Sequence, residues 1–198
     1  MAEYKMPKSV SHAEVKQVRK LGVEFRLSTS VGTDVSFDEL RSAHDAIFLA
    51  VGLGQTNKLN IPGEDLDGVI DALHFIERVK TRDWRSVPLG QNVIVLGAGN
   101  TAIDAVTQAK RLGAGKVTLV YRRTEKDAPA YDYEMELARK DGIEFMWQTS
   151  PVEILGTERV SGMRVTDAAA LVSEIPCDQV IKAIGQQKMV SFFADIAG

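Results

Sequence analysis

The sequence predicts an α/β fold of the Rossmann-like nucleotide-binding type, and two observations carry this prediction. First, residues 92–105 contain an apolar strand pattern, then Gly-Ala-Gly-Asn-Thr-Ala, then an amphipathic helix pattern. A strand, a tight glycine turn and a helix start in this order hold the pyrophosphate of a dinucleotide. Second, residues 14–30 resemble residues 134–150, so the chain contains parts of two similar units.

The bulk composition is that of an ordinary folded protein and argues against several classes of function. The chain has 198 residues, 44% of them hydrophobic and 26% charged, which suffices for one domain and part of a second. A net charge of −3 without a basic block argues against a nucleic acid partner. No apolar run approaches the ~18 residues of a membrane span. The single cysteine, Cys177, excludes an internal disulfide and fits the reducing cytoplasm.

The first part of the sequence predicts two helices and one half-buried strand. A capping box formed by Ser11 and Glu14 opens a helix, and Gly22 ends it. Apolar residues then alternate with charged ones over 23–27, which is typical of a strand with one buried face. A second capping box over 36–39 opens a short helix.

The remaining elements alternate between strands and helices. Continuous apolar runs that end at glycine predict strands, and apolar residues three or four apart predict helices. Before the glycine turn, the predicted elements are a buried strand over 46–52, a turn-rich hinge over 53–67, a helix over 69–79 and a break over 88–90. The strand and turn of 92–102 are followed by a helix that Gly113 ends, a strand over 116–121, and a helix that Asp132 opens and Asp141-Gly142 ends. The last predicted elements are strands over 143–148, 151–156, 160–165 and 179–185, and the start of a helix over 190–197.

The internal repeat points to two copies of one nucleotide-binding unit. When residues 14–30 are laid on residues 134–150, eight positions are identical. Each copy has a helix, a glycine and a strand, and each ends in an Ala-x-Gly strand, at 50–52 and at 183–185. Chance similarity between two helix–glycine–strand units is the alternative. If the repeat is real, the first glycine turn precedes residue 1, and we expect the chain to be a fragment of a longer protein.

The glycine turn supplies the candidate phosphate site. Gly97 permits the tight turn, and Gly99, which lacks Cβ, lets the backbone approach a pyrophosphate. Ala102 takes the third position of the motif and is small enough for close packing of helix and strand. Backbone N–H groups at the helix start face the phosphates, and Asn100 and Thr101 add side-chain donors. A tight turn that binds nothing is the alternative.

The end of the next strand indicates which dinucleotide binds. NAD enzymes place an acidic residue about 20 residues after the turn, where it accepts a hydrogen bond from the ribose 2′-hydroxyl. Here the position reads Val-Tyr-Arg-Arg-Thr, and no carboxylate occurs before Glu125. The guanidinium groups of Arg122 and Arg123 suit a 2′-phosphate, so the sequence favours NADP(H) over NAD(H). The alternative is that both arginines are solvated, one of them paired with Glu125 or Asp127.

Seven short motifs, spread over nearly the whole chain, resemble one known family. They lie at 31–35, 48–52, 61–64, 97–104, 120–123, 128–130 and 183–186. Together they resemble the glutamate synthase small-subunit family, which includes the NADPH-dependent reductase halves of dihydropyrimidine dehydrogenases and related ferredoxin:NADP oxidoreductases. The resemblance implies cofactor contacts at Ala183 and Gly185. The chain departs from the family at Tyr131, where many members have arginine, and at Ala128, where methionine is usual, and 166–176 is shorter than usual.

The resemblance also implies a flavoprotein with two dinucleotide-binding domains, in which an NADPH domain is inserted into an FAD domain. Residues 1–65 would end the first FAD segment, 66–186 would form the NADP(H)-binding domain, and 187–198 would return to the FAD domain. NADPH would reduce FAD, and electrons would pass to iron–sulfur clusters or a partner subunit. Because the FAD fingerprint is not in this sequence, we expect an incomplete FAD site, no activity in isolation, and apolar surface open to missing segments or self-association.

Other reactive residues receive structural roles, and the sequence predicts neither a catalytic nor a metal-binding residue. His12, His44 and His74 are scattered without ligand spacing, and Cys177 begins a strand as a small apolar residue. Asp104 lies one turn into the cofactor helix, where a structural bond to a neighbouring loop is favoured over a cofactor contact. Hydride transfer needs no general acid or base, because the cofactors perform the chemistry. Two alternatives stay open: a nucleotide-binding module without turnover, and a flavin-free NAD(P)-dependent dehydrogenase.

Overall fold

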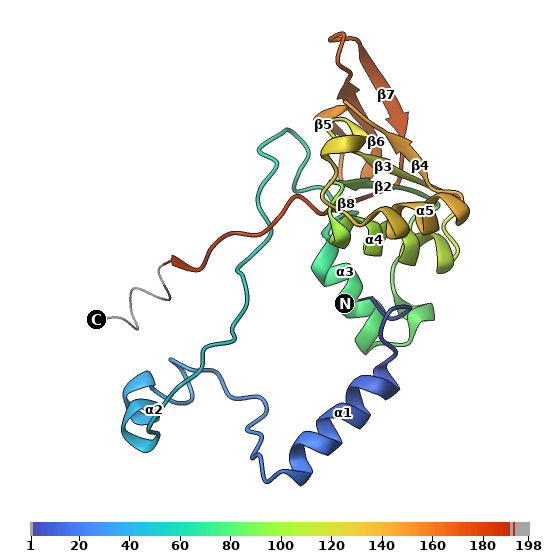
Figure 1. Ribbon diagram of the computed structural model, residues 1–198. Helices are drawn as coiled ribbons and strands as arrows, with labels where there is room; N and C mark the ends of the chain where they lie inside the picture. Colours follow the sequence, from blue (N-terminus) through green and yellow to red (C-terminus); the bar gives the residue numbers. More distant parts are fainter. Residues whose placement is uncertain (1, 191, 193–198) are drawn as a thin grey trace. The chain divides into compact units, whose positions relative to one another are not determined.

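The computed structural model describes residues 2–190 and residue 192, and its chain divides into two compact units (Figure 1). The larger unit contains Met1–Lys8 and Thr56–Gly185, and the smaller unit contains Ser9–Gln55 and Gln186–Gly198. Both units are discontinuous in sequence.

A five-stranded parallel sheet forms the centre of the larger unit. Its strands, in spatial order, are β1 (Val69–Asp71), β8 (Gln179–Lys182), β2 (Asn92–Leu96), β3 (Lys116–Val120) and β4 (Glu144–Met146). From β2 the chain adds β3 and β4 on one side, and it returns to the other side with β8. The carboxyl ends of β2 and β8 therefore meet where the direction of winding reverses, which is the usual ligand position in open parallel sheets.

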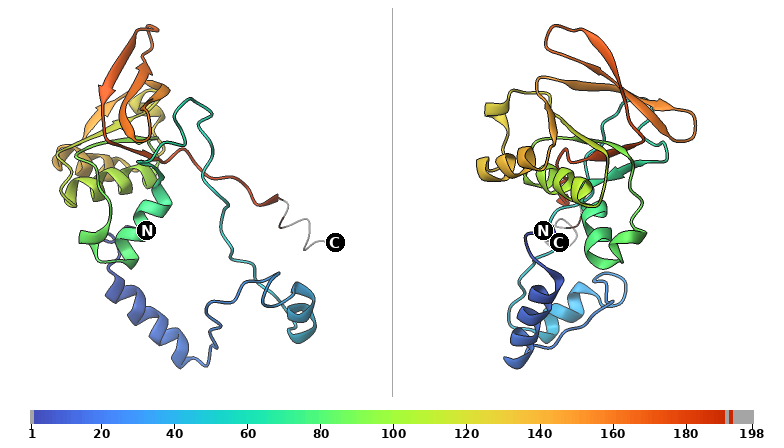
Figure 2. Two further views of the ribbon diagram at one scale, coloured as in Figure 1. Left: turned by 180° about the vertical axis from the view of Figure 1, so that it is seen from behind. Right: turned by 90° about the vertical axis from the view of Figure 1, so that its right-hand side faces the viewer.

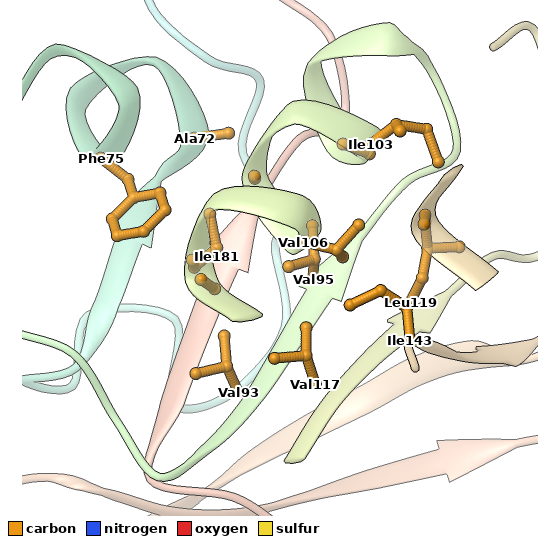
Figure 3. Packing of buried hydrophobic residues seen from close by; sticks show 14 of the residues in the cluster. Ala72, Phe75, Val93, Val95, Ile103, Val106, Val117, Leu119, Ile143 and Ile181 are labelled. Carbon is orange, nitrogen blue, oxygen red and sulfur yellow. The ribbon is translucent and has the colours of Figure 1, made fainter. Parts of the chain in front are cut away.

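Both faces of this sheet are covered, which explains the unbroken apolar run of β2. Three helices lie on one face (Figures 1 and 2): α3 (Ala72–Thr81), α4 (Asn100–Arg111) and α5 (Asp132–Lys140). Val93 and Val95 point to this helical side, where they pack with Phe75, Ile103 and other apolar residues (Figure 3). The alternate β2 residues, Ile94 and Leu96, belong to the core on the other face.

An antiparallel sheet covers that second face. It has the order β5-β6-β7, with β5 at Ser150–Gly156, β6 at Val160–Thr166 and β7 at Val172–Pro176. Met163 and Ile154 are its most buried large side chains and pack with Ile94 and Leu96. The predicted strands at 143–148, 151–156 and 160–165 are confirmed, whereas β7 has no counterpart among the predictions. Two short 3-10 helices, η1 (Trp84–Ser86) and η2 (Glu125–Asp127), complete the unit.

Three predictions for the larger unit need correction at element ends. Val69 lies in β1, so the helix predicted over 69–79 starts later, at Ala72 in α3. The last strand stops at Lys182, short of the predicted 185. Asp132 is the first residue of α5, and the N-cap is Tyr131, which makes no side-chain capping bond. Because β1 ends directly before α3, Val69 falls at an apolar spacing that also fits the helix, and the helix was therefore predicted to start too early.

The smaller unit confirms one capping box and contradicts the other. Its helices are most of α1 (Lys8–Lys20) and α2 (Phe37–Ala43). At the start of α2 the Glu39 N–H donates to Ser36 Oγ at 3.1 Å and the Ser36 N–H donates to Glu39 Oε2 at 2.7 Å, as the capping box predicts. Ser11 does not cap a helix, because α1 begins upstream, directly after Pro7.

The strands predicted over 23–27 and 46–52 are wrong, because both segments are irregular in the structure. Most of their apolar side chains are exposed: Leu27, for example, is 72% exposed and Phe48 is 92% exposed. A strand requires a neighbour for its backbone N–H and C=O groups, and neither segment has one within the described chain. Both halves of the internal repeat thus share a helix that ends at glycine, but only the second half forms its strand. Most of the helix predicted over 190–197 lies outside the described residues.

Candidate functional site

The glycine turn after β2 is built so that only glycine fits at its first position. Gly97 has a φ of +116°, and a Cβ at this residue would lie 2.3 Å from the carbonyl oxygen of Ala183. The Gly97 N–H donates to the Val120 carbonyl at 3.0 Å, and the Ala183 N–H donates to the Leu96 carbonyl at 2.8 Å. The turn is therefore fixed between the carboxyl ends of β3 and β8.

Helix α4 leaves its N-terminal N–H groups open toward this edge of the sheet. Its N-cap is Gly99, with φ −85°, and no side chain caps the helix. The Ala102 and Ile103 N–H groups donate to the Gly99 carbonyl at 2.8 and 3.1 Å. The first N–H groups of a helix have no acceptor within the helix, so those of Asn100 and Thr101 are available to an anion. Ala102 is fully buried, as its predicted packing role requires.

A loop beside the turn uses one of the predicted phosphate donors. The Tyr131 N–H donates to Asn100 Oδ1 at 3.1 Å, and the Ala130 N–H donates to the Ala98 carbonyl at 3.2 Å. These bonds join the start of α5 to the start of α4. The amide oxygen of Asn100 is thus a structural acceptor, which leaves its Nδ2 group as the side-chain donor for a ligand. At Gly99 a Cβ would meet only the Pro129 side chain, at 3.7 Å.

Arg122 and Arg123 follow β3, and both side chains are exposed. Neither guanidinium forms an ion pair with a described residue, because the two carboxylates nearby in sequence are engaged elsewhere. Glu125 pairs with Arg139 at 2.5 Å, and Asp127 accepts bonds from the N–H and hydroxyl of Thr124 at 3.1 and 2.6 Å. The Thr124 bonds lower the pKa of Asp127, and the charge of Arg123 adds to this effect.

The loop that carries Arg122 and Arg123 lies beside a cluster of aromatic side chains that was not predicted from the sequence. The Tyr121 and Trp147 rings meet edge to face at 6.1 Å, and the Phe145 and Trp147 rings stack at 5.3 Å. The Tyr121 hydroxyl donates to the Asp127 carbonyl at 3.1 Å, and the Gln148 N–H donates to the Arg123 carbonyl at 2.9 Å. These contacts fix the backbone of the loop while the guanidinium groups stay free to meet a ligand.

A partly buried ion cluster lies at the same edge of the sheet, at the end of β8. Lys182 Nζ lies 2.9 Å from Glu64 Oε1 and 3.3 Å from Asp71 Oδ1. Glu64 also accepts the N–H groups of Leu59 and Asn60, each at 2.8 Å. Although burial lowers the pKa of Lys182, the two carboxylates raise it above its ordinary value. The cluster gives the 61–64 motif a structural role: Glu64 holds its loop against the end of β8.

Ala183 and Gly185 continue from this cluster toward the turn. Gly185 has a φ of +88°, and its carbonyl accepts the Asn57 N–H at 3.0 Å. The Asn57 side chain donates to the Ile184 carbonyl at 3.3 Å. The structure therefore brings together Gly97, the start of α4 and Ala183 at one edge of the parallel sheet. Arg122 and Arg123 leave the same edge one strand away.

The remaining reactive residues have structural surroundings. Asp104 is buried and accepts a bond from the Tyr4 hydroxyl at 3.0 Å, which agrees with the favoured structural role. Cys177 is buried, and burial raises the pKa of its thiol to about 12, which keeps it protonated and unreactive. Among the described residues no group of histidine, cysteine, aspartate or glutamate side chains is arranged to hold a metal ion. In the same part of the chain no helix has the length and apolarity to cross a bilayer.

Comparison with known proteins places this geometry in a family. The glutamate synthase [NADPH] small chain of Escherichia coli is 37% identical over 209 aligned positions, which cover 92% of this chain and 44% of the relative. The NADPH-Fe(3+) oxidoreductase subunit beta of Geobacter sulfurreducens is 33% identical over 219 positions, which cover 98% of this chain and 32% of the relative. The chain thus spans less than half the length of these relatives.

Solved structures share the fold. FprA of Mycobacterium tuberculosis in complex with NADPH matches with a TM-score of 0.68 at 22% identity, over 92% of this chain and 59% of FprA. A 2-naphthoyl-CoA reductase matches with a TM-score of 0.71 at 21% identity, over 93% of this chain and 26% of the reductase. At such identities the likeness concerns the fold alone, and it confirms the predicted Rossmann-like α/β class.

The relatives also confirm the resemblance that the motifs predict, to the group of the glutamate synthase small subunit. The sequence profile of a wider family matches residues 32–197, which is most of the chain. The chain belongs to the pyridine nucleotide-disulphide oxidoreductase family.

Proposed function

We propose that the larger unit binds NADPH at the carboxyl edge of its parallel sheet. One observation carries the proposal: the uncapped start of α4 and the guanidinium groups of Arg122 and Arg123, unpaired within the described chain, lie at the ends of two adjacent strands. The first offers backbone N–H groups to the pyrophosphate, and the second offers charge-assisted hydrogen bonds to the 2′-phosphate. An NAD site would instead need a carboxylate after β3, and the carboxylates of that loop are used internally.

The residues of the turn fit a dinucleotide sterically. Gly97 is held so close to Ala183 that no side chain is tolerated, whereas Gly99 has room for a Cβ but lacks one. The open position at Gly99 supports a backbone that a pyrophosphate approaches closely. We propose that Gly97, Ala102, Ala183 and Gly185 shape this site, and that Gly99, Asn100 and Thr101 contact the phosphates.

We further propose that the chain acts within a flavin-dependent oxidoreductase. The residues of this chain would bind and orient NADPH, which would supply the hydride for reduction of FAD. The family match and the relatives named as a small chain and a subunit beta support a larger assembly. Iron–sulfur clusters or a partner subunit as the electron acceptor are part of this proposal. The domain limits 1–65, 66–186 and 187–198 remain part of this proposal, and so do a cytoplasmic location and self-association through uncovered apolar surface.

Two other functions are separable by experiment. A nucleotide-binding module without turnover would bind NADPH but reduce no acceptor when FAD and candidate acceptors are added. A flavin-free dehydrogenase would oxidise NADPH with a small substrate and without FAD. The exposed apolar side chains of the smaller unit, such as Phe48 and Leu53, favour the flavoprotein assembly, because a complete one-domain dehydrogenase would cover them.

The test is calorimetric titration of the whole chain with NADPH and NADH. Replacing Arg122 and Arg123 by alanine should weaken NADPH binding by about 1–3 kcal/mol for each charge-assisted hydrogen bond removed, and should leave NADH binding unchanged. Arg85→Ala is the matched control, because Arg85 is an exposed arginine in η1 that stacks on Trp84 and precedes the amino end of β2. Equal weakening of NADPH and NADH binding in the double variant would refute the assignment of the 2′-phosphate.

A further inference from the structure

The N-terminal segment of the larger unit, residues 2–8, is bonded to the two helices that flank the glycine turn. Lys5 Nζ lies 2.6 Å from Asp104 Oδ1 in α4 and 2.7 Å from Glu134 Oε1 in α5. The Tyr4 hydroxyl donates to the same Asp104 oxygen at 3.0 Å. Lys5 therefore joins α4 to α5 by two ion pairs, in addition to the bond that already joins Asn100, the first residue of α4, to Tyr131, the N-cap of α5.

The two carboxylates are buried and depend on Lys5 for charge compensation. Asp104 is 7% exposed and Glu134 is 4% exposed. Within the described chain, Lys5 is the cation at ion-pair distance from either one. A buried carboxylate without a partner is strongly unfavourable, so the position of Lys5 is fixed by both acids. The cluster of one cation and two anions keeps a net charge of about −1.

The cluster lies behind the proposed phosphate site. Asp104 is four residues after the first residue of α4, a rise of about 6 Å along the axis, and Glu134 is in the first turn of α5. The helix end itself carries only about half a positive charge. Two uncompensated carboxylates at this depth would outweigh it and repel an anion, since buried charges are screened little by salt.

We propose that Lys5 is a positioning residue of the dinucleotide site, which fixes α4 against α5 and offsets the negative charge of Asp104 and Glu134 behind the phosphate-binding turn. The inference rests on the proposed function for the identity of the ligand. Lys5 lies 92 positions before Gly97, outside every sequence motif that led to the site.

The test compares variants by their dissociation constants for NADPH, measured on the whole chain by calorimetry. A unit charge that acts on an anion across about 10 Å, at an effective dielectric of about 20, changes binding by about tenfold. Lys5→Met should therefore weaken NADPH binding about tenfold, and Lys5→Arg should stay within about threefold of wild type. Asp104→Asn, which keeps the shape and the acceptor for Tyr4, should tighten binding several-fold, and Lys5→Met/Asp104→Asn should recover most of the affinity that Lys5→Met removes.

These outcomes separate charge from structure. If Lys5 only supported the fold, Asp104→Asn would not tighten binding and the double variant would not recover it, and either result overturns the inference. Thermal unfolding identifies variants that do not fold, and Asp104→Asn keeps the test decisive if Lys5→Met is one of them. If wild type binds no NADPH, the proposed function fails, and the same variants are titrated with inorganic pyrophosphate. Unchanged pyrophosphate binding in the variants, or none in wild type, then overturns the inference as well.

Discussion

Gly97 and Gly99 lie two residues apart, yet the structure predicts opposite effects when alanine replaces each of them. At Gly97 the backbone has a φ of +116°, and the new Cβ would lie 2.3 Å from the Ala183 carbonyl oxygen. The left-handed backbone costs an L-residue about 1–3 kcal/mol, and the overlap costs about 1–3 kcal/mol more. Gly97→Ala should therefore lower the free energy of unfolding by about 2–6 kcal/mol.

Gly99→Ala is the matched change with the opposite signature. Its φ is −85°, and the new Cβ would make only an ordinary contact, 3.7 Å from Pro129 Cγ. We expect the free energy of unfolding to stay within about 1 kcal/mol of wild type. NADPH binding should still weaken at least about tenfold, because the methyl group would stand where the pyrophosphate approaches the backbone.

Urea unfolding followed by tryptophan fluorescence and calorimetric titration with NADPH measure the two quantities separately. Gly97→Ala should shift the urea midpoint strongly, and Gly99→Ala should shift the dissociation constant. An unchanged midpoint in Gly97→Ala would refute the account of the turn's packing. Unchanged NADPH affinity in a folded Gly99→Ala variant would refute its role at the phosphates.

Three further predictions concern the core and two titrating groups. Leu119→Ala, at a fully buried residue of β3, should lower the free energy of unfolding by about 2–5 kcal/mol in urea titrations, whereas Leu171→Ala, at a residue 67% exposed, should change it by less than about 0.5 kcal/mol. The pKa of Glu64 is lowered: burial opposes this, but bonds from Leu59, Lys182 and Asn60 outweigh burial. The ionised Glu64 carboxylate therefore stabilises the fold above pH 4.5, its ordinary pKa, and this stabilisation is lost as the pH falls through the lower pKa of the folded state. Glu64→Gln should flatten the acid side of a plot of unfolding free energy against pH. A plot identical to that of wild type would contradict the role of Glu64 in holding its loop against the end of β8. Burial raises the pKa of the Cys177 thiol to about 12, so iodoacetamide should label native protein slowly at pH 8 and urea-unfolded protein rapidly. The free energy of unfolding should also fall as the pH rises above about 8.5, because the thiol ionises more readily in the unfolded chain. Cys177→Ser should remove this fall.

The centre of the larger unit was predictable because its signals are local. The β2 strand is buried on both faces, so its apolar run is continuous, and the glycine turn and α4 follow it directly. The strands predicted over 23–27 and 46–52 failed because an apolar pattern does not supply a pairing partner. The missed strand β7 has the reverse cause: it is an edge strand with mostly exposed side chains, such as Val172 at 55%, and its burial signal is weak.

In the candidate site, too, residues in short local motifs could be found from the sequence, and contacts between distant residues could not. The glycine turn and the two arginines are short motifs that can be read directly from the sequence, and their role at a dinucleotide stays a prediction. The supporting ion clusters join residues far apart in sequence: Lys182 and Glu64 are separated by 118 positions, and Tyr4 and Asp104 by 100. No local sequence pattern indicates such partners, because only the folded arrangement of strands and helices brings the two residues of each pair together.

The most direct test of the central claim is the relative affinity of the unmodified chain for NADPH and NADH, measured by calorimetry in one buffer at one ionic strength. NADPH should bind at least about tenfold more tightly than NADH, because only NADPH carries the 2′-phosphate that the guanidinium groups of Arg122 and Arg123 would bind. Equal affinities, or tighter binding of NADH, would contradict this claim.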